Sequence, residues 1–204
     1  MPQLNDLVLD PSTAIAAIAA HLDALAEADR VAALDALGRR EQRVLYDKAS
    51  ASPPLTMAHF VPDALPPLQA VNHQGRNTLP LPGQHRRFQK CFCRPQDRSE
   101  RLFGYNDAPS RGLIGPGYFV AIATAGQPDW EARGAIVVDY FQVPDAEVCA
   151  DWPAVVPNTK GLQRFVYHRT RDFMRRVSEH VSIGAAYKGE KALDHYFTLC
   201  RRQG

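Results

Sequence analysis

The sequence predicts an α+β fold that is mainly β: a small antiparallel β-barrel of about seven or eight strands with an inserted short helix, preceded by an N-terminal helical hairpin. Three observations predict this fold class. Apolar residues recur at every second position in many short runs after residue 84, which is the period of half-buried strands. Gly, Pro and Asp residues that favour turns separate these runs. Residues 1–49 instead carry apolar residues at helical spacing in an alanine-rich stretch.

Length and composition limit the protein class. The chain has 204 residues, 45% of them hydrophobic, which suits one substantial core. A formal charge of +2 gives no global electrostatic case for nucleic acid or an anionic membrane as partner. The first ten residues carry acids where a signal peptide has a basic region, and no apolar run approaches the length of a membrane span. We therefore expect a soluble, cytoplasmic protein with reduced thiols.

Residues 1–49 are expected to form the helical hairpin. Asp10 can cap a helix whose first position is Pro11, and a second helix is expected to start after Asp29. The two apolar faces are Ile15, Ile18, Leu22 and Leu25, then Val31, Leu34, Leu37, Val44 and Leu45. Such faces need a partner surface, which is either the rest of the chain or a second copy, so a homodimer through these helices is one expectation.

Residues 50–84 are expected to be a connector, because seven prolines interrupt any regular element. Within it, residues 72–77 read Asn-His-Gln-Gly-Arg-Asn, a cluster of hydrogen-bonding side chains around a glycine. One interpretation is a loop whose side chains satisfy its own backbone. The other is a loop that closes one end of a cavity, with His73 and Asn77 in contact with a ligand.

Residues 85–204 are expected to form the barrel domain. Strands are predicted over residues 88–92, 102–105, 118–123, 135–143, 165–167, 181–187 and 195–199, with the inserted helix over 172–177. Evenly spaced antiparallel strands favour a closed or nearly closed barrel. A barrel of about eight strands is just wide enough to hold one small ligand.

Five short segments in this domain follow one another in a recognisable order. They are Val137–Tyr140, Phe165–Tyr167, Asp172–Val177, Val181–Gly184 and Tyr196–Leu199. In this order they resemble the carboxy-terminal half of the GXWXG-type barrel proteins, which are small lipocalin-like or nitrobindin-like barrels. The resemblance covers residues 85–202. The Gly-x-Trp-x-Gly signature itself is absent, since Trp130 and Trp152 stand in other contexts.

The resemblance implies a small β-barrel, with haem or lipid as the ligand classes of such barrels. We expect no cofactor, with haem as the alternative. Neutral imidazole is a common axial haem ligand, which makes His168, His180 and His195 the candidates, although an ordinary hydrogen bond is the simpler role for each.

Asp139 lies in the most apolar run of the chain, Ala-Ile-Val-Val-Asp-Tyr-Phe. An unpaired carboxylate is costly to bury, so Asp139 is expected to point outward, to pair with a cation or to have a raised pKa. One interpretation is an ion pair with Arg175, Arg176 or His168 that fixes the predicted helix over one barrel end. The other is an acid–base site in which Asp139, His168 and Arg175 form the catalytic group.

The principal functional hypothesis is binding of a small, largely apolar ligand in the barrel cavity. The predicted ligand contacts are Tyr105, Tyr118, Tyr140, Arg176, Tyr196, His73 and Asn77. The alternative is an enzyme that uses the same cavity for acid–base isomerisation, cyclisation or hydrolysis of a hydrophobic small molecule. A third hypothesis is a protein-interaction module that acts through the N-terminal helices.

Metal and nucleic-acid functions have weaker support. Cys91 and Cys93 share one strand face, but Cys149 and Cys200 show no paired spacing, so no metal site and no disulfide framework are expected. Residues 160–202 contain ten Lys or Arg against four Asp or Glu. Because strand alternation scatters these charges over ends and turns, nucleic acid is not expected as a partner.

Overall fold

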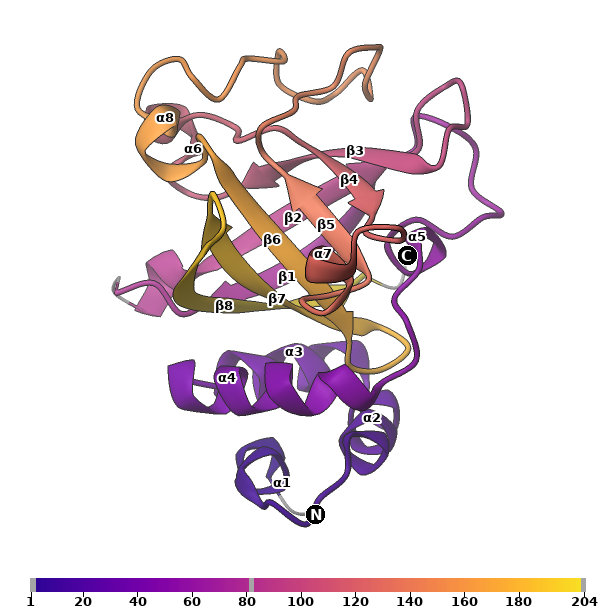
Figure 1. Ribbon diagram of the computed structural model, residues 1–204, viewed down its shortest axis with the longest axis vertical. Helices are drawn as coiled ribbons and strands as arrows, with labels where there is room; N and C mark the ends of the chain where they lie inside the picture. Colours follow the sequence, from indigo (N-terminus) through magenta and orange to yellow (C-terminus); the bar gives the residue numbers. More distant parts are fainter. Residues whose placement is uncertain (1–2, 81–82, 203–204) are drawn as a thin grey trace.

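The computed structural model describes residues 3–80 and 83–202 and contains one closed antiparallel barrel (Figure 1). Its eight strands follow the order of the chain, and the first strand pairs with both the second and the last. They are β1 Val71–Asn77, β2 Arg87–Cys93, β3 Arg101–Asp107, β4 Phe119–Ala123, β5 Ile136–Asp139, β6 Thr170–Arg176, β7 Val181–Lys188 and β8 Lys191–Arg201. The predicted fold class, a mainly β barrel preceded by helices, is confirmed.

The barrel starts at residue 71, inside the segment predicted to be a connector. The predicted loop over 72–77 is wrong, because this stretch is β1 and pairs with β2 and β8. Its inward positions are Val71, His73 and Gly75, all buried. Only one of these three is apolar, so the alternation of a strand is hard to recognise in the sequence. Pro82, also assigned to the connector, lies outside the described residues.

The inserted short helix exists, but not where it was predicted. Residues 172–177 belong mainly to strand β6, and the predicted strand over 165–167 overlaps the helix α8 (Gln163–Val166). The prediction rested on Phe173 and Val177 being four residues apart. That interval is even, so it fits the period of a strand as well as that of a helix.

The N-terminal region contains four short helices instead of the predicted two. They are α1 Leu4–Leu9, α2 Ile15–Asp23, α3 Glu27–Asp35 and α4 Arg39–Lys48. Asp10 does not begin a helix at Pro11: its carboxylate accepts hydrogen bonds from the backbone and hydroxyl of Ser12 and from Thr13, which holds a turn between α1 and α2. Gly38 separates α3 from α4, and its backbone N–H donates to Glu41 at 3.0 Å.

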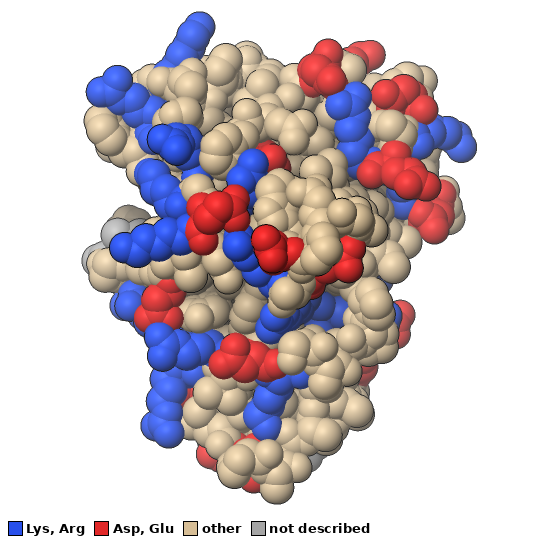
Figure 2. Space-filling model, in the orientation of Figure 1, with Lys and Arg blue, Asp and Glu red and all other residues tan. Residues whose placement is uncertain are grey.

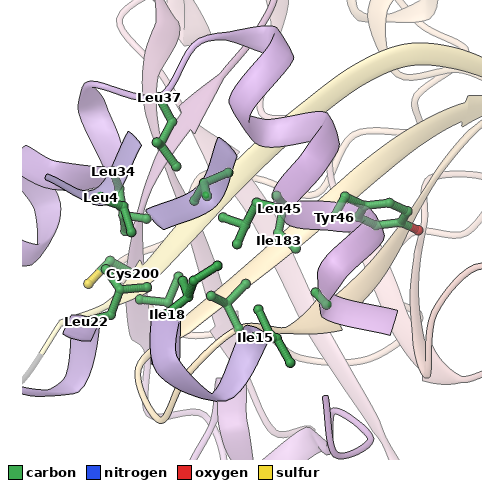
Figure 3. Packing of buried hydrophobic residues seen from close by; sticks show 14 of the residues in the cluster. Leu4, Ile15, Ile18, Leu22, Leu34, Leu37, Leu45, Tyr46, Ile183 and Cys200 are labelled. Carbon is green, nitrogen blue, oxygen red and sulfur yellow. The ribbon is translucent and has the colours of Figure 1, made fainter. Parts of the chain in front are cut away.

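These helices cover the outer face of β7 and β8 (Figure 1). Their buried apolar side chains form one cluster with residues of the two strands, shown in Figure 3. The strand side of this cluster includes Val181, Ile183, Ala185 and Cys200. The apolar faces predicted for the helices therefore pack against the barrel of the same chain.

Six shorter helical segments lie in the connections. They are η1 Ala49–Ala51, α5 Met57–Phe60, η2 Gly83–Arg86, α6 Arg111–Ile114, α7 Pro128–Glu131 and α8. One end of the barrel, the α5 end, is closed by Phe60 and Val61, which are fully buried. The Phe60 ring stacks on Phe92 at 4.6 Å between centroids, and its carbonyl accepts a hydrogen bond from His73 Nε2 at 3.0 Å.

The middle of the barrel is filled with apolar side chains. Inward positions of β1 to β6 and of β8 contribute to this core, with Leu55, Phe60 and Val61 added from the α5 end. Its strand residues include Phe92, Leu102, Phe119, Ala121, Ile136, Val138, Met174 and Leu199, each at most 2% exposed. Among the described residues, no helix has the length and apolar character needed to cross a membrane.

Candidate functional site

A lysine is buried inside the barrel at the end opposite α5, here called the α8 end. Lys90 on β2 is 1% exposed, and its Nζ donates three hydrogen bonds. The acceptors are Asn106 Oδ1 at 3.0 Å, Asp172 Oδ2 at 3.1 Å and the Tyr140 hydroxyl. Because an ammonium group has three donors, this set satisfies all of them. The four side chains are called the Lys90 cluster below.

The members of the cluster also contact one another. The Tyr140 hydroxyl donates to Asp172 Oδ2 at 3.2 Å and accepts from Asn106 Nδ2 at 3.0 Å. Asn106 Nδ2 also donates to the carbonyl oxygen of Gly117 at 2.9 Å. The cluster therefore joins β2, β3, the end of β5 and β6 through one connected set of hydrogen bonds.

Aromatic rings surround the ammonium group of Lys90. Its Nζ lies 4.9 Å from the ring centroids of Phe119 and Phe197, 5.0 Å from that of Tyr140 and 5.9 Å from that of Phe88. A cation over the face of an aromatic ring is attracted by the ring quadrupole, most strongly where water is excluded. These rings compensate part of the cost of removing the charge from water.

Glycines on neighbouring strands make room for these rings. A Cβ atom at Gly75 would collide with the ring of Phe88, one at Gly104 with Phe119, and one at Gly184 with Phe197. Each glycine thus leaves space that an inward phenylalanine fills. The ring cage therefore depends on glycine–phenylalanine pairs across directly paired strands.

Burial shifts the pKa values of the cluster toward the uncharged forms. It lowers the pKa of Lys90 and raises the pKa of Asp172, while the attraction between the two groups opposes both shifts. Burial also raises the pKa of Tyr140 well above its usual value, so its hydroxyl keeps its proton at neutral pH. The site therefore combines an amine of lowered basicity with a phenol that keeps its proton.

Two half-buried rings lie between the cluster and the surface. Tyr167 stacks on Tyr140 with 5.2 Å between centroids, and Phe88 belongs to the ring cage. Gly117, with a φ of 54°, lies against the Tyr167 ring, where a Cβ atom would collide with it. A molecule that approaches from the α8 end meets Tyr167 and Phe88 before it reaches Lys90.

Of the four tyrosines predicted as ligand contacts, the structure places Tyr140 in the Lys90 cluster. Tyr105 on β3 and Tyr118, which immediately precedes β4, lie on the outer face of the barrel, where both rings pack against Trp152. Tyr196 also faces outward, with its ring 5.6 Å from that of Tyr46 on α4.

The residues of the predicted acid–base group do not meet inside the barrel. Asp139 faces outward, accepts from Phe141 N at 2.9 Å and lies 3.4 Å from Arg171 Nε. Arg175 donates to the backbone oxygens of Tyr46 and Ala132, both at 2.8 Å, on the helix side of the barrel. His168 is half-buried in the connection between β5 and β6.

The other three predicted ligand contacts, His73, Asn77 and Arg176, lie outside the Lys90 cluster. His73 is buried inside the barrel at the α5 end, and burial lowers its pKa to about 4. Asn77 ends β1, where its side-chain oxygen accepts from Leu79 N at 3.0 Å. Arg176 ends β6, where its Nε donates to Ser178 O at 3.3 Å.

Sequence reasoning missed Lys90 and Asn106, and it placed Asp172 on a helix. One signal for Lys90 was present, because it stands two residues from both Phe88 and Phe92 and so shares their strand face. A lysine between two inward aromatic residues is a buried-charge candidate. Nothing local marks Asn106 or Asp172 as its partners, because their proximity arises only when the barrel closes.

A hollow of about 680 Å³ lies outside the barrel, between α3 and the outer faces of β1 and β2. Its lining mixes apolar residues of α3 with charged ones, and it reaches Gly75 and Phe88. Among the residues that the structure describes, no group of three or more His, Cys, Asp or Glu is placed to hold a metal ion.

Comparison with protein-family models, with curated proteins and with solved structures found no match for this chain.

Proposed function

We propose that this protein binds a small, largely apolar molecule with one polar group at the α8 end of the barrel. The observation that carries this proposal is the fully buried Lys90, held by Asp172, Tyr140 and Asn106 inside a cage of aromatic rings. Ligand sites in proteins commonly combine apolar walls with a few polar anchors in this way.

Stability alone does not explain a charged pair at this position. A buried ion pair is often no more stabilising than apolar side chains of similar size, because desolvation offsets the attraction. The next inward layer of the same barrel is filled by apolar residues such as Phe92, Val138 and Met174. Apolar residues at the Lys90 cluster would serve a purely structural barrel equally well, which supports a functional role for the polar ones.

The cluster is suited to a ligand with a hydrogen-bond acceptor, such as a carbonyl, a carboxylate or a sulfonate. An acceptor on the ligand would replace Asn106 Oδ1 or the Tyr140 hydroxyl as the partner of one Lys90 N–H, and Phe88, Phe119 and Phe197 would supply apolar contact around it. Binding requires Tyr167 or Phe88 to change rotamer, since these rings lie between the ammonium group and the surface.

A fluorescence titration with 1-anilinonaphthalene-8-sulfonate, an aromatic anion, tests this proposal. We expect saturable binding that weakens about ten- to hundredfold in Lys90→Met, because a charge-assisted hydrogen bond is lost. Tyr140→Phe keeps the ring and removes only the hydroxyl, and it should weaken binding by a smaller factor. Lys191→Met, at an exposed position on β8, is the matched control and should bind as the unmodified protein does.

Circular dichroism at the titration temperature establishes that each variant is folded. Equal affinity of folded Lys90→Met and the unmodified protein would exclude the α8 end as the binding site. Unsaturable fluorescence shared by all variants would mean that the probe reports general surface exposure.

A second candidate is an enzyme in which Lys90 attacks a carbonyl carbon. The lowered pKa of Lys90 favours the uncharged, nucleophilic amine, and the adjacent Tyr140 hydroxyl, which keeps its proton, can donate a hydrogen bond to the carbonyl oxygen. The amine nitrogen forms a bond to the carbonyl carbon, and loss of water gives an imine. In this hypothesis Lys90 and Tyr140 take the place of the predicted acid–base group, since Asp139 and Arg175 face away from the cluster.

Reductive trapping with benzaldehyde and sodium cyanoborohydride, followed by peptide mass mapping, tests the enzyme hypothesis. At neutral pH we expect Lys90 to be alkylated before the exposed lysines, because burial lowers the pKa of Lys90. Labelling of Lys160, Lys188 and Lys191 without Lys90 would contradict it.

A further inference from the structure

Two short helices at the α8 end carry large apolar side chains that face solvent. Leu113 of α6 is 75% exposed, Phe165 of α8 is 65% exposed, and Val166 is 42% exposed. Leu162, which immediately precedes α8, is 48% exposed. These four residues, here called the α6–α8 patch, include all but one of the exposed large hydrophobic residues in the described chain. Grouped exposed apolar residues usually mark an interaction surface.

The patch is a single surface region formed by two distant parts of the sequence. Figure 1 shows α6 and α8 next to each other at one end of the barrel. Gln163 of α8 joins them, because its side-chain oxygen accepts a hydrogen bond from Gly117 N, just after α6, at 3.2 Å. Gln163 is itself buried, with its amide donating to Pro157 O at 2.9 Å. The position of α8 is thus fixed by polar contacts, while its apolar side chains are left outside.

Lys and Arg outnumber Asp and Glu around the patch, where Arg111 of α6 pairs with Asp107 at 3.1 Å. Residues 152–171 contain four Lys or Arg and no Asp or Glu. Of these, Lys160, Arg164 and Arg169 are exposed, and the Arg164 guanidinium lies 4.7 Å from the Phe165 ring centroid. In Figure 2 the upper left of the molecule, over α6 and α8, shows Lys and Arg without Asp or Glu, whereas acidic residues gather at the upper right. The formal charge of +2 conceals this local asymmetry.

We propose that the α6–α8 patch docks on an anionic membrane surface. Exposed aromatic and aliphatic side chains enter the interface between headgroups and acyl chains, and flanking Lys and Arg bind anionic headgroups. The cationic rim disfavours a second copy of this chain as the occupant, because two like-charged rims would face each other. The electrostatic part of the attraction acts within a Debye length, so binding depends on ionic strength.

The patch lies at the same end of the barrel as the Lys90 cluster. Tyr167, which follows Val166 directly, is the residue that stacks on Tyr140 of the cluster. The docking proposal nevertheless stands on residues outside the cluster. Vesicle binding and probe binding can therefore fail independently of each other.

Co-sedimentation of the full chain with vesicles tests the docking proposal. The two vesicle types are phosphatidylcholine alone and phosphatidylcholine mixed with phosphatidylserine. We expect binding to the mixed vesicles only, weakened by added salt. Phe165→Ser should reduce the affinity about tenfold or more, because one buried aromatic contact is lost. The double change Lys160→Glu and Arg164→Glu should reduce it by a similar or larger factor.

Phe141→Ser is the matched control. Phe141 is also exposed, at 44%, but its ring lies under the Arg171 guanidinium, outside the patch. This variant should bind as the unmodified protein does. The proposal is overturned if the protein ignores both vesicle types at low salt, or if Phe165→Ser binds normally. It is also overturned if ultracentrifugation shows a dimer that Phe165→Ser dissociates, since the patch would then be a contact between two copies.

Discussion

Lys90 Nζ lies 3.1 Å from Asp172 Oδ2, and this ion pair connects opposite walls of the barrel. β2 and β6 are four strands apart in a closed order of eight, so the two side chains meet across the interior. Their side chains are 2% and 8% exposed. An interaction of this kind depends on both partners, because either one alone would leave a charge buried without compensation.

A double-mutant cycle measures this dependence. We expect Lys90→Met or Asp172→Leu alone to reduce the free energy of unfolding by about 3–5 kcal/mol, and the double variant to lose much less than the sum. Urea denaturation followed by circular dichroism gives the values. Additive losses would show that Lys90 and Asp172 do not compensate each other.

Acidification should destabilise the α5 end of the barrel through His73. Burial lowers its pKa to about 4 from the ordinary value of 6.5, so the unfolded chain binds the proton more readily than the folded one does. Stability from this residue is therefore complete above pH 6.5, decreases as the pH falls, and is lost near pH 4. The loss amounts to about 3 kcal/mol. The pKa of buried His59 is also lowered well below its usual value, so this residue too should reduce the free energy of unfolding as the pH falls.

Replacement by glutamine isolates the contribution of His73. The amide of His73→Gln can still donate to Phe60 O but does not titrate in this range. The free energy of unfolding of this variant, measured from pH 7 to pH 4, should fall less steeply than that of the unmodified protein. Parallel curves would contradict the assignment.

The inward glycines should be sensitive to a single added methyl group. A Cβ atom at Gly104 would collide with the Phe119 ring and with the Cys91 carbonyl, and a backbone atom cannot rotate away. We expect Gly104→Ala to cost about 1–3 kcal/mol of stability. Gly112→Ala on α6 is the matched control, because no atom lies within 4 Å of the place its new methyl group would take, and its stability should change little. Thermal denaturation of the two variants makes the comparison.

Removal of residues 1–49 should prevent the barrel from staying monomeric. The helices cover Val181, Ile183 and Ala185 on the outer face of β7, which would otherwise meet water. Size-exclusion chromatography should show aggregates or no soluble protein. A shorter deletion of residues 1–9 removes only α1, with buried Leu4 and Val8, and should be tolerated better. A soluble, monomeric barrel without residues 1–49 would show that the helices form a separate unit.

Periodicity predicted a closed or nearly closed barrel, but it did not locate all of the strands. Strands such as β5 and β7 have continuous apolar alternation, and they were placed within a few residues of their true ends. β1 was missed because His73 and Gly75 occupy inward positions, and β6 was mistaken for a helix because Asp172 and the arginines dilute its pattern. In each case a polar residue at an inward position interrupts the apolar alternation by which a strand is recognised.

The candidate site was predicted only in part, for a related reason. Tyr140 was one of four tyrosines predicted to contact a ligand, whereas the three other residues of the Lys90 cluster come from separate strands. Their proximity is set by strand order and register, which no local pattern specifies. The predicted cytoplasmic location and the homodimer remain predictions.

The N-terminal helices are synthesised long before the strands on which they pack. The helices α1–α4 are made first, but the strands that cover their apolar faces, β7 and β8, are made last. β1 likewise waits for β8 before the barrel can close. The amphipathic helices of a nascent chain therefore lack their partner strands until β7 and β8 have been synthesised.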